Sequence, residues 1–143
     1  IEIAAPQDFC FEVISDLEKY PEFLKTTSAV KTTKKGEQVL AEFQVSIVKT
    51  ISYTLGFKLN KPTRIDWSLV RGDMMKKNSG TWIFESINPQ LTKCIYQIDV
   101  EFGWLVPKSI VEMLTEVQLP DVMASFQNRV ETLYSGRKQK EKA

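Results

Sequence analysis

The last long segment of the chain, residues 120–134, has the apolar spacing of an amphipathic helix. Its hydrophobic residues return at three- and four-residue steps: Leu119, Val122, Met123, Phe126, Val130, Leu133 and Tyr134. At about 1.5 Å per residue, such a helix is a rod of about 22 Å. A rod of that length with a single apolar stripe needs a broad apolar surface to lie on.

The segment before it carries a second helical stripe with a different phase, formed by Val106, Ile110, Met113, Leu114 and Val117. The centre of this stripe lies about 140° around the helix from that of the first, so one straight helix cannot bury both. Pro120 has no amide hydrogen and crowds the preceding turn. The pattern predicts two helices with a break near residues 118–120.

Two short helices are expected near the start of the chain, after an edge strand at residues 1–4. Pro6 is suited to opening the first helix, whose apolar stripe is Phe9, Cys10, Val13, Ile14 and Leu17 and which should end near residues 16–18. Tyr20 precedes a proline and is therefore expected to be extended. The second short helix is expected over residues 21–25.

From Val30 onward the apolar period changes to two, which is typical of half-buried antiparallel strands. Strands are predicted over residues 29–34, 39–48, 51–59, 64–70, 80–84 and 94–102, with the polar stretch 71–78 as a loop or a frayed ladder. Gly36 marks a turn, because glycine adopts a positive φ at little cost. The fold class is therefore α+β: a curved antiparallel sheet of six or seven strands wrapped on a long C-terminal helix, with two short helices after the first strand.

The length of 143 residues fits one domain, which we place at residues 1–136, followed by a mobile basic tail at 137–143. The net charge of +1 gives no overall field for binding DNA. No apolar run approaches the length of a transmembrane helix. Cys10 and Cys94 lie in separate apolar stretches, which predicts buried free thiols and a reducing, cytoplasmic location.

Catalytic and metal-binding patterns are not found in the sequence. The chain has no histidine, which removes the commonest general base and metal ligand. It has no glycine-rich phosphate loop and no nucleophile motif. We therefore assign no catalytic residues, metal ligands or cofactor and favour binding over catalysis. Arg64, Arg71 and Arg129 are candidates to orient a polar ligand group, although solvated arginines are the commoner case.

The inward-facing residues of the predicted sheet and of the last helix are the candidate ligand contacts, because apolar pockets are lined mainly by hydrophobic and aromatic side chains. Tyrosine and tryptophan also offer a hydrogen bond beside their apolar rings. The alternative is that all these side chains simply fill a core. The candidates are Phe43, Tyr53, Leu55, Trp67, Trp82, Phe84, Tyr96, Ile98, Met123, Phe126 and Val130.

Two local motifs resemble a known family. Residues 16–24, Asp-Leu-Glu-Lys-Tyr-Pro-Glu-Phe-Leu, look like a D-x-x-x-Y-P-x-F-L element, and residues 69–72 with 79–84 look like an L-x-x-G … G-x-W-x-F run. Both are similar to the coenzyme Q-binding and ribosome-association-toxin-like branch of the START-like helix-grip (SRPBCC) superfamily, which also includes polyketide cyclases/dehydrases. The resemblance covers nearly the whole chain and implies a deep apolar cavity between sheet and helix.

Three functions are in keeping with this resemblance. The first is a non-enzymatic module that binds, carries or chaperones a hydrophobic small molecule such as a quinone, a polyprenyl compound or another lipid. The second is a ribosome- or protein-associating factor that uses the outer surface, chiefly Lys31, Lys34, Lys35, Lys76 and Lys77. The third is a polyketide cyclase or dehydratase, which would need a polar cluster deep in the cavity.

A transient contact with a membrane surface is a further expectation. The segment 104–119 is apolar with few charges, and Trp104 beside Lys108 suits a membrane interface. It would act as a lid on the cavity or as a lipid-facing patch, unless it is an ordinary docked helix. Met74 and Met75, followed by two lysines, could make a similar contact.

Overall fold

A single twisted antiparallel sheet forms the body of the molecule. The computed structural model describes residues 1–46, 50–72, 74–103, 106–112 and 118–142. Within these residues the sheet has seven strands in the order β1-β7-β6-β5-β4-β3-β2, and every neighbouring pair is antiparallel. The strands are β1 Glu2–Ile3, β2 Thr27–Lys35, β3 Gln38–Ser46, β4 Thr50–Asn60, β5 Arg64–Gly72, β6 Met75–Asn88 and β7 Leu91–Phe102.

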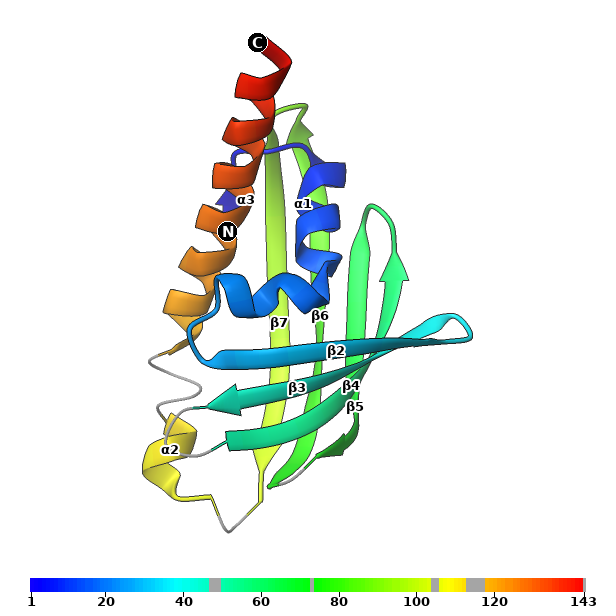
Figure 1. Cartoon of the computed structure of the whole chain (residues 1–143), viewed down its shortest axis with the longest axis vertical. Coiled ribbons are helices and arrows are strands. Elements are labelled where there is room, and N and C mark those ends of the chain that lie inside the picture. The colour runs from blue at the N-terminus through cyan, green and yellow to red at the C-terminus, as the bar shows by residue number, and fades with distance from the viewer. Residues whose placement is uncertain (47–49, 73, 104–105, 113–117, 143) are drawn as a thin grey trace.

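The helices lie on one side of this sheet (Figure 1). The long helix α3 (Gln118–Lys142) runs along β7, and α1 (Gln7–Ser15) lies beside it and contacts β6 and β7. The short 3-10 helix η1 (Leu17–Glu22) follows α1 and contacts β2, while α2 (Lys108–Glu112) lies at the opposite end of the molecule from the C-terminus. The expected α+β helix-grip architecture is confirmed.

The strand register agrees with the period-two pattern. Four side chains of β3 and β4 are buried on the inner face: Ala41, Phe43, Leu55 and Phe57. Across the two strands, Ala41 pairs with Leu55 and Phe43 pairs with Tyr53. Gly36 has φ of 64° in the tight turn between β2 and β3, as expected. The inner face of the sheet and the stripe of α3 therefore close on a shared core.

The polar stretch 71–78 is mostly strand, so of the two predicted alternatives, a loop or a frayed ladder, the loop is wrong. β5 continues to Gly72 and β6 already begins at Met75. Lys77 and Asn78 pair with Glu101 and Val100 of β7, so the β6–β7 ladder supplies backbone hydrogen bonds that the polar composition did not suggest. As a result, Asn78 becomes part of the sheet.

The second N-terminal helix was also misplaced. The sequence indicated residues 21–25, with Tyr20 extended, whereas η1 covers Leu17–Glu22 with Pro21 inside it. Tyr20 is buried, and its hydroxyl donates a hydrogen bond to the Ile14 carbonyl at 2.5 Å. The bias of a residue before proline is local and weak. Burial of the Tyr20 ring and its hydrogen bond override it.

The C-terminal region contains two separate helices, α2 and α3. Residues 113–117 lie outside the described residues, and α3 already begins at Gln118. The predicted break at 118–120 is therefore wrong in position, because Pro120 occupies the first turn of α3, where a missing amide hydrogen removes no intrahelical bond. At the other end, α3 extends through residues 137–142, which the sequence placed in a tail.

Candidate functional site: an apolar cavity between the sheet and α3

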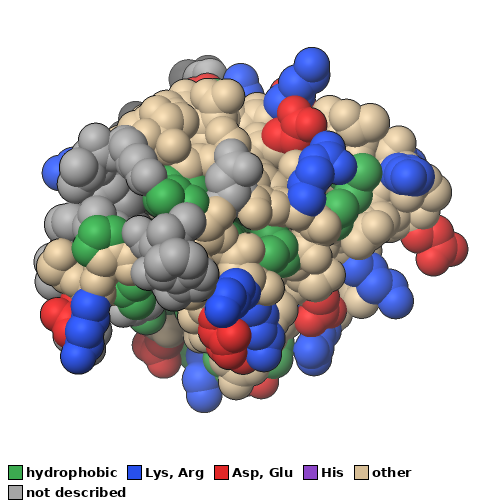
Figure 2. All heavy atoms as spheres, turned by 90° about the horizontal axis from the view of Figure 1, so that it is seen from below, with side chains coloured by type: hydrophobic (Ala, Val, Ile, Leu, Met, Phe, Trp, Pro, Cys, Tyr) green, Lys and Arg blue, Asp and Glu red, His purple; other side chains and the backbone are tan. Residues whose placement is uncertain are grey.

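A cavity of about 490 Å³ lies between the inner face of the sheet and α3. Strands β2 to β7, η1 and the first half of α3 all contribute to its walls. Met75, Phe102 and Leu119 border its lower end, where β6 begins, β7 ends and α3 begins. Several hydrophobic side chains come to the surface at this end, with charged side chains around them (Figure 2).

Eight of the eleven predicted ligand contacts line this cavity. They are Phe43, Tyr53, Leu55, Trp67, Trp82, Tyr96, Ile98 and Phe126. The alternation of the strands turns the side chains inward, and Phe126 faces them from α3. The structure thus brings residues from six elements, β3 to β7 and α3, to one cavity.

Phe84, Met123 and Val130 are not among the residues that line the cavity. Phe84 is buried against Phe11 of α1, with the two ring centroids 5.8 Å apart. Val130 is fully buried, and Met123 packs against the same core. These three side chains therefore pack in the core and not at the cavity wall, and Phe84 does so against α1, which contacts β6 and β7 there.

Aromatic rings make up much of the cavity wall. Trp67 stacks on Tyr96 with centroids 5.6 Å apart, and Trp82 lies 4.7 Å from the same tyrosine ring. Phe43 stacks on Tyr53 at 5.4 Å. Offset and tilted arrangements of this kind are favourable for aromatic pairs, so the wall is well packed and still presents ring faces to the cavity.

The tyrosines in the wall remain protonated hydrogen-bond donors. Burial raises the pKa of Tyr53 well above its usual range, and burial together with the neighbouring Tyr53 raises the pKa of Tyr96. Neither hydroxyl has a hydrogen-bond partner among the described residues. Both therefore offer a donor to a bound molecule.

Sequence reasoning missed two of the polar wall residues, Tyr20 and Asn78. Asn78 is buried, and its Oδ1 accepts a hydrogen bond from Trp67 Nε1 at 3.1 Å. A signal was present in the sequence: Gly80, Trp82 and Phe84 alternate inward, and one more step of two residues back reaches Asn78. The polar composition of 71–78 concealed it.

The three arginines suggested as ligand-orienting groups pair with carboxylates away from the cavity. Arg64 contacts Asp66 at 2.9 Å and Arg71 contacts Glu42 at 3.4 Å, both on exposed surface. The Arg129 guanidinium lies 2.8 Å from Glu22 and 5.2 Å from the centroid of the Phe23 ring. Arg129 thereby joins α3 to the end of η1.

The described part of the chain shows neither a metal-binding cluster nor a membrane-spanning helix. Its His, Cys, Asp and Glu side chains do not gather anywhere into a set of three or more able to hold a metal ion. Neither α3 nor a shorter described helix combines the length and apolar content needed to cross a bilayer. Trp104, Leu105 and 113–117, which carry much of the expected lid or membrane contact, lie outside the described residues.

Similar folds occur in proteins of solved structure. The chain superposes on the Zhui aromatase/cyclase of Streptomyces sp. R1128 with a TM-score of 0.77 at 20% identity, covering 92% of this chain and 90% of that one. For a START superfamily protein of Mycobacterium smegmatis the TM-score is 0.79 at 22% identity, covering 93% and 94%. For a STAR-related lipid transfer protein of Xanthomonas axonopodis it is 0.72 at 12% identity, covering 91% and 82%. These likenesses establish the fold.

Comparison of the sequence with known families gives a more specific result. None of the curated proteins matches the chain. The model of the family described as "Polyketide cyclase / dehydrase and lipid transport" matches residues 3–127, which is most of the chain and includes β2 to β7, α1 and the cavity-lining turns of α3. The chain therefore belongs to the polyketide cyclase/dehydrase and lipid transport family, with the START-like helix-grip fold.

Proposed function

We propose that this protein binds a hydrophobic small molecule, such as a quinone, a polyprenyl compound or another lipid, in the cavity between the sheet and α3. The observation that carries the proposal is the cavity itself, about 490 Å³ in volume and walled mainly by aromatic and aliphatic side chains. Small-molecule sites in proteins have volumes of about 300–1,000 Å³ and similar walls. A space of this size, if it were left empty, would forfeit dispersion contacts and would destabilise the fold.

Two measurements test the binding of a hydrophobic ligand. Organic extraction of the purified protein, followed by mass spectrometry, should recover a co-purified lipid or quinone. The uncharged dye N-phenyl-1-naphthylamine should then bind to the extracted protein saturably, at one molecule per chain, with a rise in fluorescence. Failure to extract a ligand together with non-saturable dye binding would contradict the proposal.

A matched pair of variants on α3 locates the bound dye. Val122 lines the cavity, so Val122→Phe should reduce its volume and weaken dye binding several-fold. Thr132 lies on the exposed face of the same helix, so Thr132→Phe adds a ring without entering the cavity and should leave the affinity unchanged. Equal affinities of the two variants would place the dye elsewhere.

Catalysis as a polyketide cyclase or dehydratase is a second candidate. It is supported by the family and by the polar side chains of Tyr53, Asn78 and Tyr96 in the cavity wall. The two functions predict different fates for a bound molecule. A carrier returns its ligand chemically unchanged after prolonged incubation, whereas a cyclase would release water and a product of altered mass.

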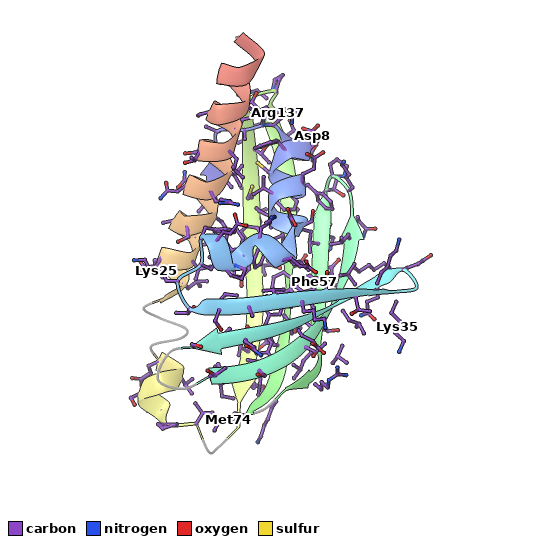
Figure 3. The ribbon with its side chains drawn as sticks, in the orientation of Figure 1. Asp8, Lys25, Lys35, Phe57, Met74 and Arg137 are labelled. Carbon is purple, nitrogen blue, oxygen red and sulfur yellow. The ribbon has the colours of Figure 1, made fainter. Side chains whose placement is uncertain are left out.

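The ribosome-associating alternative has weaker support in the surface charges. Lys35 lies at the far tip of the β2–β3 hairpin, whereas Met74, two residues before Lys76 in the chain, lies at the lower end of the molecule (Figure 3). Lys77 also forms an ion pair with Asp99. The basic residues named for this function thus divide between two places, and cosedimentation with ribosomes at low and high salt would test it.

A further inference from the structure

The proposed cavity contains a fixed hydrogen-bond donor, the side-chain amide of Asn78. Asn78 lines the cavity and is only 5% exposed. Its Oδ1 accepts from Trp67 Nε1 at 3.1 Å. An indole N–H can only donate, so the amide must turn its oxygen toward Trp67 and its Nδ2 away from it.

The Nδ2 group has no hydrogen-bond partner among the described residues. Nδ2 is not among the fully enclosed unpaired polar atoms of the described residues, so it keeps some accessible surface. Because Asn78 lines the cavity, a ligand or a water there can accept a hydrogen bond from it. An unpaired donor in an apolar wall therefore favours a ligand with an acceptor atom at that point.

Gly80 makes this arrangement geometrically possible. Trp67 of β5 pairs directly with Gly80 of β6, two residues along the same face from Asn78. A Cβ atom at position 80 would lie 2.4 Å and 2.8 Å from two carbons of the Trp67 ring. The indole lies flat across Gly80 because that position has no side chain, and its N–H thereby reaches Asn78.

Tyr96 belongs to the same part of the wall. The Tyr96 ring stacks on Trp67, so Asn78 and Tyr96 both contact the same indole. Both groups are uncharged donors. An oxygen with two lone pairs, such as a carbonyl oxygen, can accept from one or both of them.

The charge of the wall argues against an anionic ligand. Among the lining residues that the structure describes there is no lysine or arginine, and the single charged residue is Asp99, whose carboxylate pairs with Lys77 at the exposed rim. A carboxylate or phosphate moved into this cavity would lose its hydration without gaining a cation, which is costly. A ketone or ester oxygen needs no such compensation.

Building on the proposed function, we propose that Asn78 is a specificity-determining residue, held by Trp67, that selects uncharged ligands carrying a carbonyl oxygen over carboxylates and over plain hydrocarbons. The Asn78 amide donates to the carbonyl oxygen while the aromatic wall packs against the rest of the molecule. The protein thus recognises the head group of its ligand through a hydrogen bond between uncharged groups.

Three probes of nearly the same shape test this selection: 2-methylnaphthalene, 2-acetylnaphthalene and 2-naphthoate. Their dissociation constants are measured by tryptophan fluorescence or by displacement of N-phenyl-1-naphthylamine. The ketone should bind about five- to tenfold more tightly than the hydrocarbon, as expected for one net hydrogen bond. The carboxylate, which differs from the ketone chiefly in its charge, should bind at least about tenfold more weakly than the ketone.

The variant Asn78→Leu removes the donor and keeps a similar volume, so the ketone should lose its advantage while the hydrocarbon binds as before or better. Asn128→Leu makes the same substitution on the exposed face of α3 and is the control. Trp67→Phe keeps a ring but frees the amide to rotate, and should reduce the preference in part. Thermal melts verify that each variant is folded.

The outcomes separate the two levels of the proposal. Equal binding of ketone and carboxylate, or an unchanged ketone-to-hydrocarbon ratio in Asn78→Leu, would overturn the selection by Asn78 while leaving a hydrophobic binding protein. Failure of all three probes and of N-phenyl-1-naphthylamine to bind saturably would overturn both.

Discussion

At the scale of single residues, the chemistry of the cavity depends on what each side chain lies against. Trp67 could have been one more core aromatic, but its position over Gly80 turns its N–H toward Asn78. Tyr20 and Tyr53 both line the cavity, yet the hydroxyl of Tyr20 already donates to the Ile14 carbonyl, whereas that of Tyr53 has no partner among the described residues. Residue type alone does not distinguish a wall donor that is satisfied from one that is free.

A first prediction concerns Gly80. In Gly80→Ala the new methyl group would lie 2.4 Å from the Gln97 carbonyl oxygen and 2.4 Å from the Trp67 ring, so either the strand β6 or the Trp67 indole must move. We expect a loss of about 1–3 kcal/mol in the free energy of unfolding, measured by urea denaturation.

Gly136→Ala is the matched control for this substitution. Gly136 is exposed within α3, and a Cβ there meets no atom within 4 Å. Alanine should stabilise the helix by about 0.5–1 kcal/mol, because it has the higher helix propensity. Destabilisation of similar size in both variants would contradict the steric explanation.

A second prediction concerns the pH dependence of stability at Glu18. Its Oε1 accepts hydrogen bonds from the Thr32 hydroxyl at 2.6 Å and the Thr32 amide at 3.1 Å, and these bonds hold the pKa of Glu18 below its usual range. A carboxyl group whose pKa is lower in the folded state stabilises the fold above its unfolded pKa of about 4.3, and this contribution is lost as the pH falls through the folded value.

Glu18→Gln keeps an acceptor oxygen but removes the charge. The difference in Tm between wild type and this variant should therefore be largest near neutral pH and shrink as the pH falls from about 5 to 3. Glu37→Gln, in the exposed β2–β3 turn, provides the control. A Tm difference for Glu18→Gln that stays constant with pH would refute the assignment.

At the scale of elements, α3 both completes the core and forms one wall of the cavity. Its N-terminal half contributes Val122 and Phe126 to the cavity, whereas Val130, one turn further on, is fully buried in the core. The two halves of one stripe thus serve different purposes. The division follows from α1, which covers the sheet only beside the second half of α3.

A third prediction measures how firmly α3 is attached. Val130→Ala should lower the free energy of unfolding by about 2–3 kcal/mol, from lost apolar burial and the small void left behind. Leu133 lies on the same helix but is 40% exposed, so Leu133→Ala should lower the free energy of unfolding by less than about 1 kcal/mol. Ligand affinity should change little in either variant, since neither residue lines the cavity. Equal losses of stability would show that α3 is not anchored at Val130.

At the scale of the whole molecule, one continuous core joins the sheet, α1, η1 and α3. Cys10 of α1 and Cys94 of β7 are fully or almost fully buried in it, and both are free thiols. A hydrogen bond with Cys10 and burial raise the pKa of Cys94, so this thiol stays protonated at neutral pH. The pair reports on opening of the core from two distant parts of the chain.

A fourth prediction follows from this arrangement. Because reagents reach neither thiol in the folded protein, both cysteines should react with a maleimide slowly and at the same rate, set by global unfolding. Val130→Ala should accelerate the labelling of both cysteines equally. The cysteine introduced by Ser135→Cys, at an exposed position of α3, should react at once. Faster labelling of Cys10 alone, measured by peptide mass spectrometry, would mean that α1 opens independently of the sheet.

The architecture was largely predictable from sequence, because binary patterns decide which face of an element is buried. The alternation in β3 and β4 and the stripe on α3 were assigned to the correct faces, and the motif around residues 16–24 indicated the superfamily. Boundaries were less well predicted. Both η1 and the start of β6 depend on partners distant in the sequence, which a local pattern does not contain. Tyr20 of η1 packs against Phe43 and Phe126, and Asn78 of β6 pairs with Val100 of β7.

The same distinction, between what the local pattern predicts and what distant partners decide, applies to the candidate site. The sequence by itself determined that aromatic and aliphatic side chains face inward from both sheet and helix, since that depends only on spacing along the chain. Only the tertiary structure decided which of them enclose a cavity and which fill the core, because Phe84 packs against Phe11 of α1, whereas Trp67 packs against Tyr96 in the cavity wall. It also decided that Asn78 faces the cavity with its amide fixed, since that orientation depends on a tryptophan of the neighbouring strand and a glycine that gives it room.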